Sequence, residues 1–137
     1  MITRLLAPYL EGGFMLTYCI LPLTEDVFQI FSLSLAPDGY PLEAWMEVRY
    51  LPGIDGWVLS IWDDATGEQL VNQIPIICSL GQVNDLLRPF RHLRDGKGLG
   101  SLFCIRAEDA TTTPDPAAGN LRQFQVLYGD TIPKGGS

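Results

Sequence analysis

A strict alternation of apolar and polar side chains over residues 40–51 constrains the fold of this chain more than any other feature. The positions of one parity are mainly apolar: Leu42, Ala44, Met46, Val48 and Tyr50. The positions of the other parity are charged or amphipathic: Glu43, Trp45, Glu47 and Arg49. Because successive side chains of a β-strand point to opposite faces, the pattern predicts a strand with one face in a core and the other against water or a partner.

Turn-forming residues divide the next stretch into two predicted hairpins. The turn at 52–56 contains Pro and Gly and leads into a strand at 57–62, and the turn at 63–68 leads into a strand at 69–77. Asp side chains cap turns by bonding nearby amides, so turn capping is favoured over Ca²⁺ binding for the acids of this second turn. Pro75 removes a ladder donor and therefore predicts an edge or a bend.

The rest of the chain adds strands and almost no helix. Further strands are predicted at 17–23, 27–35, 101–107 and 121–128. Helical spacing competes only over 80–93, so at most one short helix near 80–90 is expected. About seven short strands predict an all-β, single-domain antiparallel β-sandwich or barrel.

One β-domain, residues 17–130, is expected between two terminal segments. Residues 1–16 lack periodicity but are rich in apolar side chains, which predicts an N-terminal arm that docks on the fold or on a partner. Residues 131–137 are predicted to be a flexible tail. Residues 108–120 combine acids and prolines without a large apolar side chain, which predicts a long exposed loop.

Composition and charge exclude several classes of protein. The 137 residues include 16 Asp or Glu and 9 Lys or Arg, for a formal net charge of -7, and only 18% of residues are charged. A chain with this much negative charge repels phosphate groups, and binding to nucleic acid or to an anionic membrane is therefore not expected. No stretch approaches the roughly 18 consecutive apolar residues that a membrane span requires. The low charged share favours a surface that something else partly covers.

Cysteine spacing gives no metal or disulfide signature. Cys19, Cys78 and Cys104 are an odd number, lie far apart and sit in apolar contexts. They are predicted to be reduced thiols that fill the core, and no metal or other cofactor is expected. No convincing signal peptide precedes them, so synthesis in the cytoplasm is expected.

The residues do not predict an enzyme. His92 is the only obvious base that titrates near neutrality, and Asp95 or Asp109 are its conceivable carboxylate partners. No nucleophile turn of the GxSxG kind is present, and the glycines around Lys97 lack the spacing of a phosphate-binding loop. An enzyme that acts through His92 is therefore the weakest of the functional hypotheses.

Aromatic and N-terminal apolar side chains are the best candidates for a binding surface. Trp57 and Trp62 differ by an odd number of residues, so a regular strand places them on opposite faces and leaves one free to point outward. Exposed Trp on a sheet indicates sugar stacking or a protein partner, and aromatic anchors favour the partner. The contact surfaces are predicted to be the hairpin at 57–77 and the N-terminal arm. The predicted interface residues are Leu5, Leu6, Tyr9, Phe14, Trp45, Trp57 and Trp62.

A series of short motifs follows in a fixed order along residues 17–130. The first half holds Phe31–Leu35, the strand ending at Tyr50, Gly56-Trp57-x-Leu59-x-Ile61-x-Asp63 with Gly67 and Leu70, and Ile74-Pro75-Ile76. The second half holds Gly100-Ser101-Leu102-Phe103, a loop with Asp109, Pro114 and Asp115, and then Asn120-Leu121 and Val126-Leu127-Tyr128. In this order and spacing the chain resembles the baseplate plug proteins of contractile-tailed bacteriophages.

This resemblance implies a small, β-rich structural protein of the virion, located in the tail baseplate and made in the host cytoplasm, with no catalysis. It implies packing against hub, spike and neighbouring tail proteins, closure of the distal tail end, and multiple copies, expected to be three, around the tail axis. The arm at 1–16 and the length of the 108–120 loop depart from the resemblance and are candidates for contacts specific to this virus.

Two further hypotheses accompany this reading. A glycan-binding β-sandwich of a phage tail, with Trp45 or Trp62 as the stacking platform, is the alternative. The acids of the 108–120 loop, or those at 63, 64 and 68, are expected to face the tail conduit, where negative charge would keep phosphates from sticking.

Overall fold

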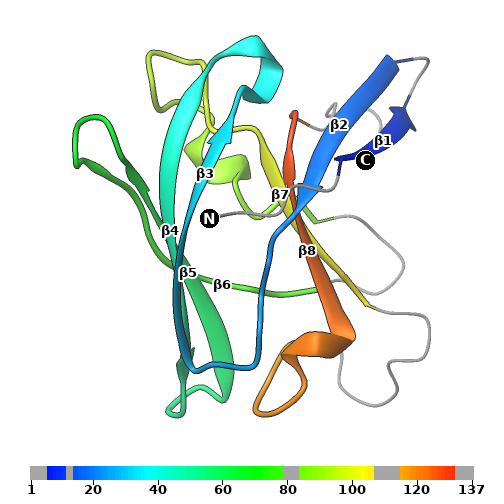
Figure 1. Ribbon diagram of the computed structural model, residues 1–137, viewed down its shortest axis with the longest axis vertical. Helices are drawn as coiled ribbons and strands as arrows, with labels where there is room; N and C mark the ends of the chain where they lie inside the picture. Colours follow the sequence, from blue (N-terminus) through cyan, green and yellow to red (C-terminus); the bar gives the residue numbers. More distant parts are fainter. Residues whose placement is uncertain (1–5, 12–13, 79–83, 107–114, 132–137) are drawn as a thin grey trace.

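Two antiparallel four-stranded sheets make up this chain in a computed structural model (Figure 1). The structure describes residues 6–11, 14–78, 84–106 and 115–131. The first sheet has the order β1 (Leu6–Glu11), β2 (Phe14–Ile20), β8 (Phe124–Gly129) and β7 (Ser101–Arg106). The second has the order β3 (Phe28–Leu35), β4 (Leu42–Leu51), β5 (Gly56–Asp63) and β6 (Gln69–Pro75). The predicted all-β antiparallel fold is confirmed, with β1 as a strand inside the segment predicted to be an arm.

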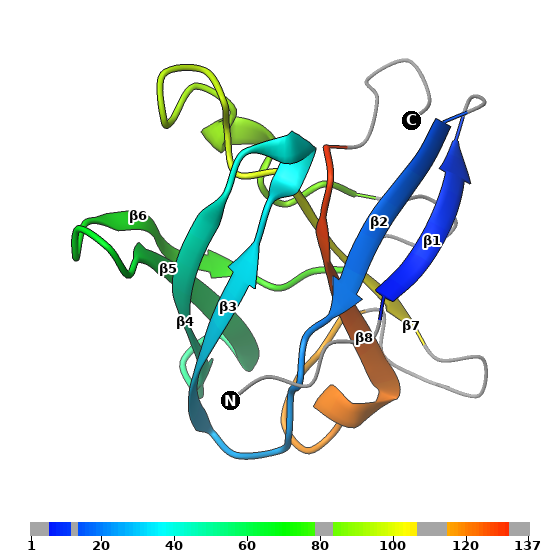
Figure 2. The ribbon, with the colours of Figure 1, turned by 45° about the horizontal axis from the view of Figure 1, so that its top comes forward.

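The two sheets pack face to face as a sandwich, with the chain crossing from β2 in one sheet to β3 in the other (Figures 1 and 2). One continuous core cluster lies between them and takes residues from both sheets, among them Met46, Leu59, Ile61, Leu102, Val126 and Tyr128. The alternation predicted for β4 is confirmed, because its apolar parity from Leu42 to Val48 is buried. Full burial of each such side chain contributes about 1.5–3 kcal/mol, so this cluster supplies the main driving force for folding.

Trp57 connects the end of the 108–120 segment to the core through a hydrogen bond. Its side chain is only 2% exposed, and its indole Nε1 donates a hydrogen bond to the carbonyl of Ala117 (2.8 Å). Nearby, the Cys78 amide donates to Asp115 Oδ1 (2.6 Å), and Pro116 is buried. The predicted exposed loop is confirmed at Ala118 and Gly119 and is wrong at Pro116, because the Asp115 carboxylate and the Ala117 carbonyl attach this part to the fold. Residues 107–114 lie outside the described part.

A buried carboxylate fixes the segment between β6 and β7. Asp85 is 7% exposed and accepts hydrogen bonds from the Leu87 amide (3.0 Å), the Leu102 amide (3.2 Å), the Ser101 hydroxyl (2.8 Å) and Arg91 Nη2 (3.1 Å). The short helix expected near 80–90 is represented in the described residues by turns and a 3-10 helix at Arg88–Phe90. The four bonds hold this segment beside β7.

Gly100 occupies a position that only glycine fits. Its φ is +84°, and a Cβ built there would lie 2.0 Å from the carbonyl oxygen of Gly129 and 2.8 Å from Cβ of Pro37. The backbone leading into β7 thus passes in direct contact with the end of β8.

The predictions for the turns and thiols hold in the described residues. The Ala65 amide donates to Asp63 Oδ1 (2.9 Å), as expected for a turn cap. Pro75 ends β6, which lies at the edge of its sheet, as predicted. The three cysteines are free and buried, and burial raises the pKa of the Cys104 thiol, so it stays protonated at neutral pH. No helix in the described ranges is long and apolar enough to cross a membrane.

Candidate interaction surface

The outer face of the β3–β6 sheet carries a stacked pair of indoles. Strand register places Ser32, Trp45, Trp62 and Gln69 in one row across the four strands. The Trp45 and Trp62 rings lie 4.6 Å apart between centroids and are inclined by 27°, so each covers one flat face of the other. Both side chains are half-buried. The pair therefore forms a rigid apolar ridge on the outside of the sandwich.

A second aromatic contact lies on the same face toward the other end of the strands. Arg49 Cζ is 4.9 Å from the centroid of the Phe28 ring, and its Nη2 is 3.2 Å from Glu47 Oε1. Phe28 and Ile30 are 48% and 50% exposed. A cation–π contact of this exposed kind is worth about 0.5–1 kcal/mol, enough to favour the orientation of the guanidinium.

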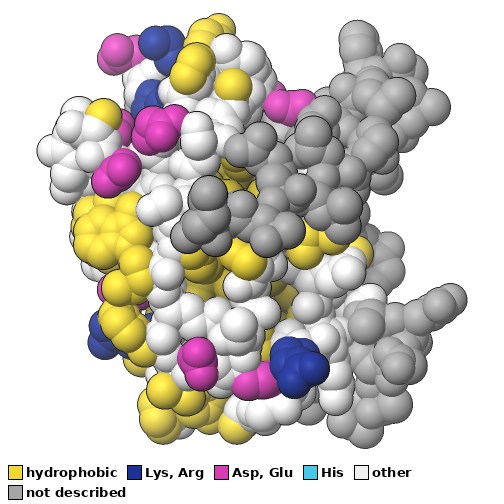
Figure 3. Space-filling view, viewed as in Figure 1, with side chains coloured by type: hydrophobic (Ala, Val, Ile, Leu, Met, Phe, Trp, Pro, Cys, Tyr) yellow, Lys and Arg dark blue, Asp and Glu magenta, His cyan; other side chains and the backbone are white. Residues whose placement is uncertain are grey.

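We call this surface the outer aromatic face and define it as Phe28, Ile30, Trp45, Arg49 and Trp62. Hydrophobic side chains gather along the left side of the molecule in Figure 3, where Figure 1 shows the sheet of β3–β6. Exposed aromatic rings next to an arginine are the composition that protein interfaces favour at their centres. The surface is therefore suited to binding a partner.

Acidic residues border this face at the Trp end. Glu43 accepts a hydrogen bond from the Ser34 hydroxyl, and its carbonyl accepts one from the Asp64 amide (2.8 Å). Asp64 and Glu68 are exposed in the turn between β5 and β6. The rim of the face is consequently negative at this end.

The structure brings together two of the predicted interface residues. Trp45 and Trp62 lie side by side on the outer face, whereas Trp57 lies in the core. The prediction that Trp57 and Trp62 point to opposite faces is confirmed. Trp57 is left out of the proposed surface, because its buried indole contacts the core and the Ala117 carbonyl.

The N-terminal part of the predicted set is less fully described. Leu6, Tyr9 and Phe14 belong to strands β1 and β2, which pair with each other, but their side chains lie outside the described part. Leu5 lies outside it altogether.

Phe28, Ile30 and Arg49 are parts of this surface that the predicted interface residues did not include. A signal was present, because Phe28 and Ile30 share one parity of a strand whose other parity holds Phe31 and Leu33. A strand with apolar residues on both parities has an apolar face left over, which is the feature that indicates a covered or binding surface.

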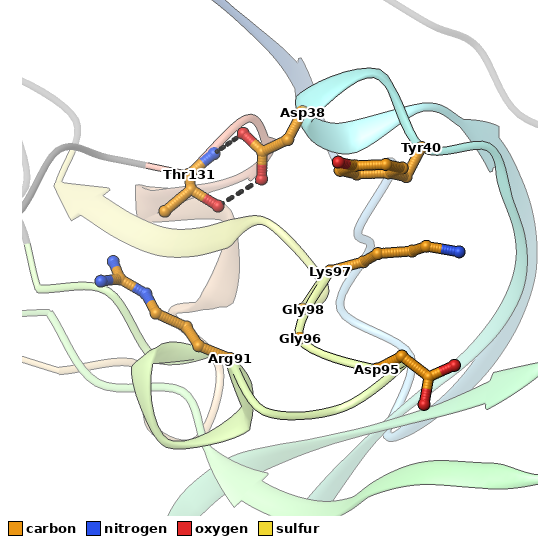
Figure 4. A pocket seen from close by; sticks show the side chains of 8 residues that line it. All are labelled: Asp38, Tyr40, Arg91, Asp95, Gly96, Lys97, Gly98 and Thr131. Carbon is orange, nitrogen blue, oxygen red and sulfur yellow. Dashed lines mark hydrogen bonds between the residues drawn. The ribbon is translucent and has the colours of Figure 1, made fainter.

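A separate hollow of about 450 Å³ lies between the segments at 38–40 and 91–98 (Figure 4). It is lined by Asp38, Tyr40, Arg91, Asp95, Gly96, Lys97, Gly98 and Thr131. Lys97 extends along the Tyr40 ring, with Nζ 5.6 Å from its centroid, and the Thr131 amide donates to Asp38 Oδ1 (2.8 Å). Several of its polar groups therefore already have partners within the fold.

The residues of the enzyme hypothesis do not form a recognisable site in the described part. His92 is exposed, Asp95 lines the hollow, and Asp109 lies outside the described residues. Across the described ranges, no group of three or more His, Cys, Asp or Glu side chains is placed to hold a metal ion.

The fold and the outer aromatic face define a class: a small all-β module whose exposed surface is suited to assembly with other proteins. The chain belongs to the family described as cyanophage baseplate Pam3 plug gp18, whose sequence model matches residues 18–132. It is a structural plug protein of a bacteriophage tail baseplate, so the resemblance found in the sequence is confirmed, and its place is in the virion tail. Membership of a structural family indicates a non-enzymatic role and association with other tail proteins. No curated protein matches the chain.

Proposed function

We propose that this protein packs through its outer aromatic face against the hub or spike proteins of the baseplate and so helps to close the distal end of the tail. The observation that carries the proposal is the stacked Trp45–Trp62 pair beside exposed Phe28 and Ile30. Apolar surface removed from water stabilises a contact by about 25 cal/mol per Å², and pre-stacked rings lose little conformational freedom when they are covered.

The low charged share of the chain supports the same proposal. A free monomer needs a well-solvated surface, whereas a subunit that is covered after assembly does not. Synthesis in the host cytoplasm, followed by assembly, agrees with three cysteines that are free and buried.

Further parts of the proposal concern symmetry and the arm. We place several copies, expected to be three, around the tail axis, because closed rotational symmetry repeats a modest contact. The N-terminal residues Leu5, Leu6, Tyr9 and Phe14 are proposed as a second contact. The acids of the 108–120 loop, or those at 63, 64 and 68, are proposed to face the conduit. The mass of the assembled subcomplex measures the copy number, and a density map of the tail locates both segments.

A binding experiment with purified baseplate proteins of the same phage tests the proposed face. The double variant Trp45→Ala with Trp62→Ala is expected to weaken binding to the hub or spike by about a hundredfold, as for the loss of an interface hot spot. Ile54→Ala is the matched control, because Ile54 is 61% exposed but lies in the β4–β5 turn, outside the face. Equal affinities for the two variants would contradict the proposal.

The glycan-binding alternative receives less support from the geometry. A sugar ring stacks on an open indole face, and in this pair each indole already gives one face to the other. Binding of a glycan on an array, lost in the double Trp variant and retained in Ile54→Ala, would favour the alternative over protein packing.

A further inference from the structure

The edge strands of the two sheets, β1, β3, β6 and β7, differ in how accessible their unpaired edges are. The β7 edge is occupied, because the Leu86 amide donates to the Leu102 carbonyl (2.8 Å) and Asp85 accepts from the Leu102 amide. β6 is irregular, with a register shift, Gln73 at a φ of +50° and Pro75 at its end. β1 contains Pro8, which has no N–H group. Devices of this kind are how proteins prevent unwanted strand pairing, and β3 has none of them.

The register of β3 and β4 shows which backbone groups of β3 point away from the sheet. The Tyr50 amide donates to the carbonyl of Val27 (2.8 Å), and these two residues lie directly opposite each other in the register that pairs Phe28 with Arg49. Hydrogen-bonded pairs alternate along an antiparallel ladder, so residues 29, 31 and 33 bond to β4. Phe28, Ile30 and Ser32 therefore direct both N–H and C=O to the side where no described strand lies.

The strand itself has the properties of a pairing site. β3 reads FQIFSLSL and contains no charge, no proline and no glycine over its eight residues. The side chains of Phe28, Ile30 and Ser32 are exposed on the outer side of the sheet. An added strand would lie about 4.8 Å from β3 and would extend the rows that hold Arg49 and the Trp pair.

We propose that β3 binds an extended segment of another baseplate protein, which adds as a further strand through the outward N–H and C=O groups of Phe28, Ile30 and Ser32. This proposal rests on the proposed assembly with tail proteins and specifies how one partner binds. The apolar exposed side chains beside the edge and the acidic rim of the same face select a segment of apolar residues with neutral or basic flanks.

A second copy of this chain is the less favourable occupant. Each copy carries a net charge of -7, which opposes self-association at low ionic strength. A pairing limited to Phe28–Ser32 also buries much less than the roughly 1,200–2,000 Å² of a stable interface. A larger partner that also covers the outer aromatic face meets that requirement.

Hydrogen exchange in the full-length protein, alone and with purified hub or spike protein of the same phage, tests the proposal directly. In the free chain the amides of Phe28, Ile30 and Ser32 are expected to exchange much faster than those of Gln29 and Phe31, which bond to β4. In the complex these three amides are expected to become protected, a readout that requires no substitution.

Ser32→Pro and Ser32→Ala provide a matched pair of variants. Proline removes only an N–H that points away from the ladder, so both variants are expected to fold with similar melting temperatures. Ser32→Pro is expected to weaken partner binding by about tenfold, the loss of one backbone hydrogen bond together with the steric block, whereas Ser32→Ala leaves binding unchanged.

The outcomes separate this proposal from the proposed function. A complex in which the three amides stay unprotected overturns strand addition and leaves the assembly role intact. No complex with any baseplate protein overturns both. A free chain that dimerises in the ultracentrifuge, with the same three amides protected, overturns the partner strand in favour of a second copy.

Discussion

The two outer faces of the sandwich carry similar residues but differ in what covers them. On the β1–β2–β8–β7 sheet, Tyr18, Phe103 and Leu127 form an apolar cluster on the outside and are 1%, 8% and 8% exposed. Tyr18 meets Phe103 edge-on at 5.0 Å between ring centroids. On the other sheet, Phe28 and Ile30 keep about half of their surface in water. Apolar residues at the strand positions that point away from the core therefore indicate that this face of the strand is covered. Whether the chain itself or a partner covers it depends on the fold.

Two tryptophans on one strand give the sharpest test of this difference. Trp57 and Trp62 both belong to β5, but Trp57 faces the core and Trp62 faces the outside. Trp57→Ala is expected to cost about 3–5 kcal/mol of unfolding free energy, because it leaves a cavity and an unpaired carbonyl at Ala117, whereas Trp62→Ala is expected to cost about 1 kcal/mol. Urea denaturation of both variants measures the difference. Similar losses would mean that Trp62 also serves as core.

The outer faces themselves can be compared through two phenylalanines. Phe103→Ala is expected to destabilise by about 3 kcal/mol, since Phe103 is buried against Tyr18 and Leu127. Phe28→Ala is expected to cost less than about 1 kcal/mol in the isolated protein, because about half of its surface already lies in water and its exposed contact with Arg49 is weak. Urea denaturation of both variants measures the two losses of unfolding free energy. An equally large loss for Phe28→Ala would contradict the distinction between the two faces.

Two ion pairs, one with a buried carboxylate and one nearer the surface, extend the comparison to charged groups. Asp85→Ala is expected to cost about 3 kcal/mol, because it leaves Arg91 and three further donors without their buried acceptor. Glu47→Ala is expected to cost less than about 1 kcal/mol, because 43% of the side chain of its partner Arg49 is exposed and water weakens the pair. Calorimetric melting of the two variants tests the order, and a more harmful Glu47→Ala would contradict it.

The smallest expected effect is a dependence of stability on pH at the β4–β5 turn. The Tyr50 hydroxyl donates to Asp55 Oδ1 (2.6 Å), which lowers the pKa of Asp55 and raises the pKa of Tyr50. Asp55 therefore stabilises the fold above its ordinary pKa of 3.8 and loses this effect as the pH falls further. Tyr50 stabilises it below its ordinary pKa of 10.0 and loses the effect as the pH rises.

The control for this pH effect is Asp55→Asn. The stability advantage of the wild-type protein over this variant is expected between these two pH values and should vanish at both extremes, with urea midpoints as the measurement. A constant difference across the range would show that the bond does not depend on ionisation.

Local patterns predicted the strands well, because β4 and its hairpins show a clear alternation of apolar and polar residues and contain typical turn residues. The order of strands did not follow from them, since β2 pairs with β8 from the far end of the chain and only tertiary packing selects that neighbour. The buried role of Asp85 was also not predictable. A lone aspartate before a leucine pair carries no sign that donors from Ser101 and Leu102, far along the chain, will bond to it together with Leu87 and Arg91.

The candidate surface was predicted in part for a related reason. Trp45 was predicted because it lies among charged residues on the polar parity of its strand, and Trp62 because its odd spacing from Trp57 places the two on opposite faces. Their stacking depends on the register that the turn at 52–56 sets. Phe28 and Arg49 were missed because their contact crosses from β3 to β4, and that pairing depends on the longer connection at 36–41.

The hydrogen bonds at Asp115 and Ala117 have a practical consequence for locating this protein in a tail. They fix the chain on one side of residues 107–114, and β7, which ends at Arg106, fixes it on the other. A stretch anchored at both ends accepts extra length at little entropic cost, since doubling a loop costs only about 0.6 kcal/mol. A short epitope inserted there should leave the sandwich intact and give electron microscopists a handle on how each plug is oriented in the assembled particle.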